Sequence, residues 1–429
     1  MAMLSVAHAT PASATPAWPV TYSVSGTDLP PTANLLPSDF LETDALGNVY
    51  SSISVWDGSA ALGTTTIDGD GTSDPGGWQM AILSHDSDGI LRWVYALPHN
   101  FGLVRMVTSP SGRTYALVQD DGSPATTFEG IPTTSGDEVL LALDDDGTTA
   151  WGMPVETLAG SVALGADDAV YLTGPGAVLT KYDATGEEVW TAAAGEADTL
   201  LVTAVTESAG NVLLNVSYAG EYTNGLTTLP DDGTTTQGAV VALDEGDGSF
   251  SWAEDYGAAG VDDGSNTIVG DGTGGAYVLA CTCAYPTPPD PWPTMVFGTE
   301  TVDDPPASGY ALAYIDDAGV FQWAMAAPGN TFDAAAGGDL RVVTYVDATV
   351  ATIGGTTVDP GSDIAYVSMT VDDTGAITFE HELDYAGGIT MWAVADGIHY
   401  VAYINGSGTI DGEPVTPASS DDVWYGLLP

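Results

Sequence analysis

Closely spaced carboxylates make Asp68-Gly-Asp70-Gly-Thr-Ser-Asp74 the strongest candidate for metal chemistry in the sequence. Glycines between Asp68, Asp70 and Asp74 would let a tight loop wrap around one ion, and Ca²⁺ prefers oxygen ligands of this kind. The segment lacks the distal glutamate of an EF-hand, and a solvated Asp/Gly turn explains the same residues. The sequence therefore leaves two interpretations open, a Ca²⁺ site on these three aspartates or a turn.

The only two cysteines, Cys281 and Cys283, are separated by one residue. In a strand their side chains would share a face, with Cα atoms about 6.6 Å apart, which is near the limit for a disulfide. A reactive thiolate needs a basic neighbour to lower its pKa, and the nearby sequence offers none. We expect a structural pair, either a disulfide or two small buried side chains.

A proline-dense stretch, residues 284–294, is the third segment with chemical potential. Proline stiffens such a loop, which would then present Tyr285 and Trp292 for stacking on a sugar ring or for receiving a partner peptide. The alternative is that Trp292 folds back onto the protein. These two aromatic residues are therefore candidate ligand-binding residues.

The charge balance excludes several classes of function. The chain has 429 residues, with 59 acidic residues against five Lys and Arg, for a net charge of −54. Nucleic-acid binding and attraction to anionic membranes both need basic residues, which are nearly absent. No apolar run reaches the 18 or so residues of a membrane-spanning helix, so we expect no nucleic-acid partner and no membrane insertion.

Residues 1–16 have a composition of their own. Ala7-His8-Ala9 matches the small-residue pattern of a signal-peptidase site, and a Pro- and Ala-rich stretch follows it. The segment is interpreted either as the remnant of a signal peptide or as a disordered linker.

A repeated hairpin motif organises the rest of the chain. An apolar pair is followed by Asp, then Gly three residues later (four in one copy), then an aromatic residue four positions beyond. Asp and Gly suit a turn between two strands, and the aromatic residue supplies packing area. The same turn chemistry accounts for most of the other Asp/Gly clusters. The six copies start at Asp86, Asp144, Asp183, Asp244, Asp316 and Asp372 and end at Trp93, Trp151, Trp190, Trp252, Trp323 and Phe379.

A second motif, a turn followed by a strand rich in Val, Tyr and Leu, occurs seven times, as in Gly47-Asn-Val-Tyr50. Seven strands against six hairpins are explained if the seventh hairpin is split between the two ends of the chain. The sequence thus predicts an all-β fold, a seven-bladed β-propeller over residues 17–429 as a single domain. Its blades are four-stranded and antiparallel, and the N-terminal strand completes the last one.

The Gly47 strand, the Gly63-Thr-Thr connection and the hairpin from Lys181 to Trp190 together resemble the secreted bacterial seven-bladed β-propeller repeat family. The resemblance covers nearly the whole chain and implies the fold rather than an activity, because members mostly lack an assigned biochemical role. The hairpin alone is also similar to the repeats of quinoprotein dehydrogenases and of the outer-membrane assembly propeller.

No catalytic constellation is left over once the repeats are assigned. The five histidines show no metal-ligand spacing, and nothing selects one carboxylate pair from 59 acids. We therefore expect a non-catalytic binding or structural module, secreted or at the cell surface, in a saline setting, possessing an extracellular protein or carbohydrate ligand. The alternatives are an extracellular polysaccharide-acting enzyme that uses carboxylates at a central mouth, and a quinoprotein-like dehydrogenase.

Overall fold

A computed structural model describes residues 20–22 and 35–428, apart from internal gaps. The gaps are 56, 71–76, 100, 121–125, 156–159, 232, 234–235, 259–262, 283–292, 304–309, 328–330, 337–338, 348–350, 354–355, 359–363, 385–387, 395–396, 405–407, 411–412 and 416–421. Residues 1–16, with their predicted role as signal remnant or linker, lie outside the described residues. The chain divides into two compact units, residues 1–157, 360–365 and 382–429 in the first and residues 158–359 and 366–381 in the second.

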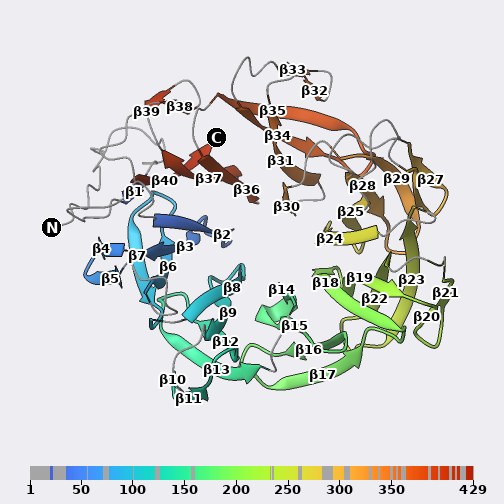
Figure 1. Ribbon diagram of the computed structural model, residues 1–429, viewed down its shortest axis with the longest axis horizontal. Coiled ribbons are helices and arrows are strands. Elements are labelled where there is room, and N and C mark those ends of the chain that lie inside the picture. Colours follow the sequence, from blue (N-terminus) through green and yellow to red (C-terminus); the bar gives the residue numbers. More distant parts are fainter. Residues whose placement is uncertain are drawn as a thin grey trace. The chain divides into compact units, whose positions relative to one another are not determined.

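Antiparallel sheets make up nearly all of the described chain, as predicted (Figure 1). In the first unit, three four-stranded sheets follow chain order. They are β2 (Leu35–Thr43), β3 (Val49–Val55), β6 (Gln79–His85) and β7 (Leu91–Ala96); β8 (Phe101–Thr108), β9 (Thr114–Asp120), β12 (Glu138–Leu143) and β13 (Thr149–Val155); and β36 (Gly388–Val394), β37 (Gly397–Ile404), β40 (Asp422–Leu428) and β1 (Val20–Tyr22). Because β1 pairs with β40, the N-terminal strand completes the last sheet, and this prediction is confirmed.

The second unit continues the same pattern. Its sheets are β14 (Val162–Leu164), β15 (Val170–Gly174), β16 (Val178–Tyr182) and β17 (Glu188–Ala193); β18 (Thr199–Ser208), β19 (Asn211–Ala219), β22 (Gln237–Asp244) and β23 (Phe250–Gly257); and β24 (Asp263–Gly270), β25 (Ala276–Thr282), β28 (Tyr310–Ile315) and β29 (Phe321–Ala326). A further sheet, β30 (Thr331–Ala336), β31 (Asp339–Asp347), β34 (Ile364–Val371) and β35 (Ile377–Asp384), lies mostly in this unit. One 3₁₀ turn, η1 (Ala166–Asp168), is the helical element of the described residues.

Small two-stranded hairpins fill most connections between the second and third strands of a sheet. They are β4 (Asp57–Leu62) with β5 (Thr65–Asp70), β10 (Thr126–Phe128) with β11 (Ile131–Thr133), β20 (Tyr222–Thr223) with β21 (Thr228–Leu229), β26 (Met295–Phe297) with β27 (Glu300–Val302), β32 (Ala351–Ile353) with β33 (Thr356–Val358), and β38 (Gly408–Ile410) with β39 (Glu413–Val415). The exception is the sheet that begins at β14, where a short turn joins β15 to β16. The β4–β5 hairpin contains the Gly63-Thr-Thr connection of the sequence.

Each Asp–Gly motif forms the turn between the last two strands of its sheet. Asp316 illustrates the chemistry, because its Oδ1 accepts the backbone N–H groups of Ala318 and Val320 at 3.0 and 2.9 Å. Gly319 takes a φ of +79°, which a residue with a Cβ adopts only under strain. A β-bulge follows, and Trp323 sits directly after it, opposite Tyr314. The turn therefore fixes where the indole side chain stands on the strand.

The tryptophans of this motif join one sheet to the next. The Trp252 indole N–H donates to the carbonyl oxygen of Asp317 in the following hairpin turn at 3.1 Å. A Cβ added to Gly319 would come within 2.7 Å of the Trp252 ring, so only glycine lets the ring lie flat on the turn. The same bond recurs from Trp93 to Asp145, Trp190 to Glu245 and Trp323 to Asp373. We call this contact the Trp–Gly junction.

The small hairpins join neighbouring sheets as well. Strand β26 pairs with β23, the outer strand of the preceding sheet, and Phe297 stacks on Tyr256 with ring centroids 5.4 Å apart. Thr223 of β20 exchanges two backbone hydrogen bonds with Glu196, and the Tyr95 hydroxyl donates to Glu129 at the β10–β11 turn at 2.8 Å. These contacts cover strand ends that would otherwise be exposed edges.

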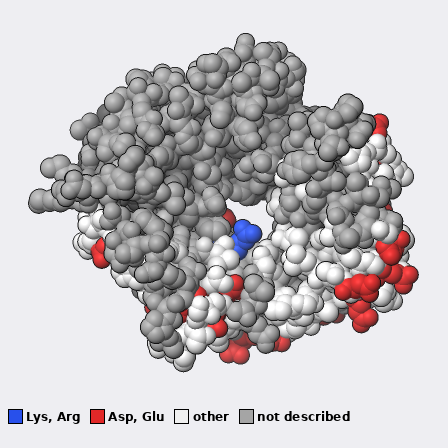
Figure 2. Space-filling view, viewed as in Figure 1, with Lys and Arg blue, Asp and Glu red and all other residues white. Residues whose placement is uncertain are grey.

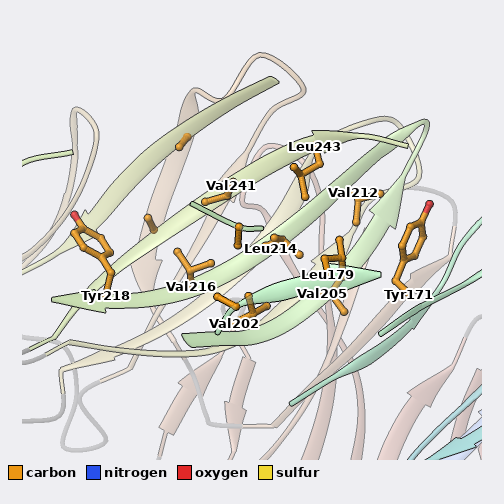
Figure 3. Close-up of a cluster of buried hydrophobic side chains, with 14 of the residues drawn as sticks. Tyr171, Leu179, Val202, Val205, Val212, Leu214, Val216, Tyr218, Val241 and Leu243 are labelled. Carbon is orange, nitrogen blue, oxygen red and sulfur yellow. The ribbon is translucent and has the colours of Figure 1, made fainter. Parts of the chain in front are cut away.

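Apolar side chains fill the space between successive sheets. In the second unit, Leu179 and Tyr171 from the β14–β17 sheet meet Val202, Leu214 and other side chains of the next sheet (Figure 3). All four are nearly fully buried. Burying such side chains contributes about 1.5–3 kcal/mol each, which makes these inter-sheet clusters the main source of stability.

Candidate binding surface

Polar side chains cluster at the end of each sheet that carries the Asp–Gly turns. In the first unit the Arg92 guanidinium donates to Asp145 Oδ1 at 2.6 Å and to the Tyr50 hydroxyl at 3.1 Å. The Tyr50 hydroxyl in turn donates to Asp44 Oδ2 at 2.9 Å. Burial and the bond to Asp44 raise the pKa of Tyr50 well above its usual value. Every charge in this cluster has a partner, so the cluster joins two sheets rather than presenting a reactive group.

The second unit has a similar ion pair. Lys181 Nζ lies 2.9 Å from Glu245 Oε1 and 5.6 Å from the centre of the Tyr171 ring. Glu245 also supplies the carbonyl that accepts the Trp190 indole N–H at 3.0 Å. Lys181 and Glu245 are both largely buried, so this pair reinforces a Trp–Gly junction.

Buried Asp271 is a heavily hydrogen-bonded carboxylate of the second unit. Its oxygens accept the hydroxyl protons of Ser208, Thr273 and Tyr314 at 2.9, 2.6 and 2.7 Å, and two backbone N–H groups as well. Burial alone would raise its pKa, but these hydrogen bonds lower it overall. Asp271 is thereby kept ionised with its lone pairs occupied, which suits a structural role.

Replacing Arg92 with methionine should lower the free energy of unfolding by about 1–2 kcal/mol. The substitution keeps the apolar stem but removes charge-assisted hydrogen bonds to Asp145, Tyr50 and Ser84. Urea denaturation followed by tryptophan fluorescence measures the change. Arg105→Met makes the same change of charge at an exposed residue and should stay within about 0.5 kcal/mol of wild type. Equal effects of the two variants would contradict this interpretation of the cluster.

Two first strands, β8 and β18, present a different kind of surface. Strands β8 and β18 each lie at one end of their sheet's strand order, so one side of each backbone pairs with no other strand of the described chain. Neither β8 nor the stretch Thr199–Thr206 of β18 contains an acidic residue. This differs from the turns, where aspartate recurs. Figure 2 shows the acidic side chains gathered in patches, with Lys or Arg visible at one place in that view.

A β-bulge interrupts both first strands at the same point of the ladder. Val104 is bulged out between Leu103 and Arg105, and Thr203 between Val202 and Ala204. The Thr203 hydroxyl donates to the Asn215 carbonyl at 3.0 Å. Bulges turn side chains out of the regular alternation, and they often border functional sites.

The exposed side chains of these strands are one cation and several aliphatic groups. Arg105 is exposed, and its neighbours Leu103, Val104 and Val107 are half-buried. On β18, Leu201 is 57% exposed, which is unusual for a leucine within a strand. The arrangement can hold a ligand through aliphatic contacts and a guanidinium. The first-strand surface is therefore our candidate binding surface, taken separately in each unit.

The predicted calcium ligands lie only partly within the described residues. Asp68 is exposed on β5, and its Oδ2 lies 4.0 Å from His99 Nε2. Asp70 ends the same strand with its side chain outside the description, and Asp74 lies wholly outside it. Residues 68–70 thus continue a strand instead of turning. No group of three or more potential ligands that could hold a metal occurs among the residues described.

The other sequence-predicted site residues lie almost entirely beyond the described chain. Cys281 is half-buried on β25, whereas Cys283 lies outside the described residues. Tyr285 and Trp292 also fall in the 283–292 gap. The disulfide and the aromatic loop therefore stay predictions.

Sequence reasoning did not find the first-strand surface. Arg105 was identifiable as one of five basic residues. The sequence does not show, however, that Arg92, Arg113 and Lys181 form ion pairs whereas Arg105 is exposed. Leu201 carries no signal in the sequence, because an apolar residue in a strand is expected to be buried. Only the three-dimensional arrangement separates these two residues from their neighbours.

Comparisons with known proteins give limited guidance. No protein-family profile and no curated protein matches the chain. Among solved structures, BamB from Moraxella catarrhalis is 13% identical, with 95% of this chain and all of that chain covered and a TM-score of 0.39. The Dos1 propeller is 11% identical, with 93% and 94% covered and a TM-score of 0.45. A protein of unknown function from Bacteroides caccae is 10% identical, with 62% and 78% covered and a TM-score of 0.33.

No helix in the described part of the chain has the length and apolar character needed to cross a membrane.

Proposed function

We propose that the sheets are the blades of one seven-bladed β-propeller spanning residues 17–429. Repetition of the same meander, pairing of β1 with β40, and Trp–Gly junctions between successive sheets support this arrangement. Small-angle X-ray scattering provides a test. A single compact domain of this length has a radius of gyration of about 22 Å, and two separated units would give a clearly larger value.

We further propose that the protein is a non-catalytic binding module, secreted or at the cell surface, with an extracellular protein or carbohydrate as ligand. The observation that carries this proposal is the first-strand surface, which is neutral or basic and partly apolar in a chain of net charge −54. The turn-end clusters support it indirectly, because their charges are satisfied within the protein.

A screen of glycans and extracellular proteins immobilised on arrays, run beside a hydrolase assay on the glycans that bind, tests the function. Binding without turnover is the expected result. Cleavage of any bound polysaccharide would overturn the non-catalytic proposal in favour of an enzyme.

We also propose a saline environment, which the net charge of −54 supports. Exposed carboxylates repel one another at low ionic strength, and salt shortens the Debye length from about 30 Å at 0.01 M to about 3 Å at 1 M. We therefore expect the melting temperature to rise as NaCl increases from 0.01 to 1 M. A flat or falling melting temperature would contradict this setting.

Calcium binding by Asp68, Asp70 and Asp74 is a separate proposal with its own test. If the site exists, saturating Ca²⁺ should raise the melting temperature, since a ligand at 100 times its Kd stabilises the folded state by about 2.7 kcal/mol. EDTA should reverse the shift, and the double variant Asp68→Asn/Asp74→Asn should abolish it. Asp88→Asn, which removes one charge from another turn, is the control and should keep the shift.

A further inference from the structure

The turn of the β20–β21 hairpin carries an asparagine followed by a glycine, Asn224 and Gly225 (Figure 1). One other asparagine of the chain, Asn405, also precedes glycine, and it lies outside the described residues. The remaining asparagines of the described chain each precede valine or threonine, whose β-branched side chains crowd the backbone nitrogen of that residue. They are Asn48, Asn211, Asn215 and Asn266. Glycine leaves this nitrogen open to the asparagine side chain.

The hairpin holds the Asn224 carboxamide by its oxygen alone. Oδ1 accepts the backbone N–H groups of Leu226 and Thr227 at 3.0 and 2.8 Å. Nδ2 is buried near the Tyr222 hydroxyl but makes no hydrogen bond with the described residues. Two donors on the oxygen stabilise the negative charge that develops there when a nucleophile adds to the carboxamide carbon. The nitrogen, which would be the leaving group, is held by no such bond.

Gly225 provides the nucleophile. It is exposed with a φ of +84°, and a Cβ placed on it would meet nothing within 4 Å, so its backbone is open to solvent. Its N–H donates to Thr223 Oγ1 at 3.4 Å, which is a long and weak hydrogen bond. Hydroxide can therefore reach this N–H group and remove its proton.

We propose that Asn224 is a modification site, at which the folded protein converts asparagine into isoaspartate and aspartate without an enzyme. The deprotonated Gly225 nitrogen bonds to Asn224 Cγ, the bond from Cγ to Nδ2 breaks, and the amide group takes a proton from water and leaves as ammonia. Water then opens the resulting five-membered imide at either of its two carbonyl groups. Overall, one water molecule is consumed and one ammonia is released. The inference is independent of the proposed binding function.

Conversion to isoaspartate changes the length of the turn, because the main chain then runs through one additional carbon atom. The Asn224 N–H donates to the Thr227 carbonyl at 3.2 Å, and Thr223 exchanges hydrogen bonds of 2.8 and 2.9 Å with Glu196, which follows β17. Both contacts depend on the present spacing of the hairpin. The modification should therefore loosen the hairpin and its pairing with Glu196.

The test incubates the full chain at 37 °C and pH 8 for several weeks and follows each asparagine by peptide mapping with mass spectrometry. We expect the converted fraction at Asn224 to be roughly ten times that at Asn211, which precedes valine, or greater. Labelling with an isoaspartyl methyltransferase identifies the isoaspartate. The rate should be higher at pH 9 than at pH 7, because the attacking nitrogen must lose its proton.

The peptide acetyl-Tyr-Thr-Asn-Gly-Leu-Thr-amide gives the rate of the same sequence without the hairpin. If Asn224 stays intact, converts no faster than Asn211, or converts at a rate independent of pH, the proposal is wrong. A rate in the folded protein more than roughly tenfold below that of the peptide would overturn it as well, because the hairpin would then protect Asn224 instead of activating it.

Asn224→Gln is the matched control for the effect on the hairpin. It keeps the carboxamide, but its longer side chain would have to close a six-membered ring, so it should resist conversion. If glutamine disturbs the turn, Asn224→Ser replaces it, since a serine hydroxyl can accept the same N–H groups. Hydrogen exchange at the Thr223 amide should become several-fold faster in incubated wild type and stay unchanged in the variant. Equal acceleration in both proteins, or conversion without acceleration, would overturn the loosening of the hairpin.

Discussion

Replacing Trp190 with alanine should lower the free energy of unfolding by about 4 kcal/mol, near the upper range for loss of a large side chain from a core. Trp190 is 9% exposed and belongs to the cluster between the β14–β17 and β18–β23 sheets. Its indole N–H donates to the Glu245 carbonyl at 3.0 Å, and its ring lies against Gly248. The substitution removes the packing and leaves that carbonyl without its donor. Urea denaturation monitored by circular dichroism measures the loss.

Three further variants separate the causes. Trp190→Phe keeps most of the ring but not the N–H donor, so it should cost about 1–2 kcal/mol. Val189→Ala, at the half-exposed bulge residue beside it, is the control and should cost under about 1 kcal/mol. Gly248→Ala places a Cβ within 2.8 Å of the ring at a φ of +72° and should cost about as much as Trp190→Phe.

The double variant Trp190→Ala/Gly248→Ala tests whether the two residues of the Trp–Gly junction stabilise the protein together. Once the ring is gone, the new Cβ has nothing to meet, so the combined loss should be smaller than the sum of the single losses. Additive losses would mean that the two residues act independently, and the Trp–Gly junction would then not be a unit of stability.

The sequence predicted the hairpin because its determinants are local. Asp316 and Gly319 specify a turn through their own backbone bonds and φ preference, so the positions of strands β28 and β29 follow from spacing alone. What the spacing did not indicate is that Gly319 also receives Trp252 of the preceding copy. That contact joins residues 67 positions apart, and no local rule distinguishes a glycine needed for a turn from one needed for close approach.

The connections between strands likewise show that local sequence patterns predict a hairpin but not its contacts with another sheet. The segment around Gly298 forms a hairpin, as the Gly63-Thr-Thr connection does. Its pairing with β23 of the preceding sheet depends on how two sheets stack, which the sequence of the connection does not encode. The candidate sites were harder to predict from the sequence than the connections, because the exposure of Arg105 and the burial of Asp271 depend on how the chain packs.

A buried histidine should make the protein lose stability in mild acid, by about 2 kcal/mol between pH 7 and pH 5. His85 is completely buried on β6, and burial lowers its pKa from 6.5 to about 3. In the unfolded chain the imidazole binds a proton near pH 6.5, whereas in the folded chain it stays neutral down to about pH 3. The unfolded state therefore binds more protons throughout that window, and protonation favours unfolding as the pH falls.

The size of the effect follows from linkage. Its slope approaches 1.4 kcal/mol per pH unit once the pH is well below 6.5, and the contribution of His85 is fully present only above that value. Carboxylate repulsion acts in the opposite direction, because protonating acids relieves a net charge of −54. The measurement is therefore the difference in the free energy of unfolding between wild type and His85→Gln at pH 7, 6 and 5. Comparing the two proteins at each pH cancels the shared carboxylate term.

We expect His85→Gln to be less stable than wild type at pH 7, because a buried side chain is replaced, and to lose less stability on acidification. His99→Gln changes a histidine that is about half exposed and should follow the wild-type pH dependence. If His85→Gln and wild type fall in parallel from pH 7 to pH 5, then His85 takes up its proton in the folded state. Its strand would have to admit water at the β6–β7 turn, and the tightly packed inter-sheet core derived above would be wrong at that point.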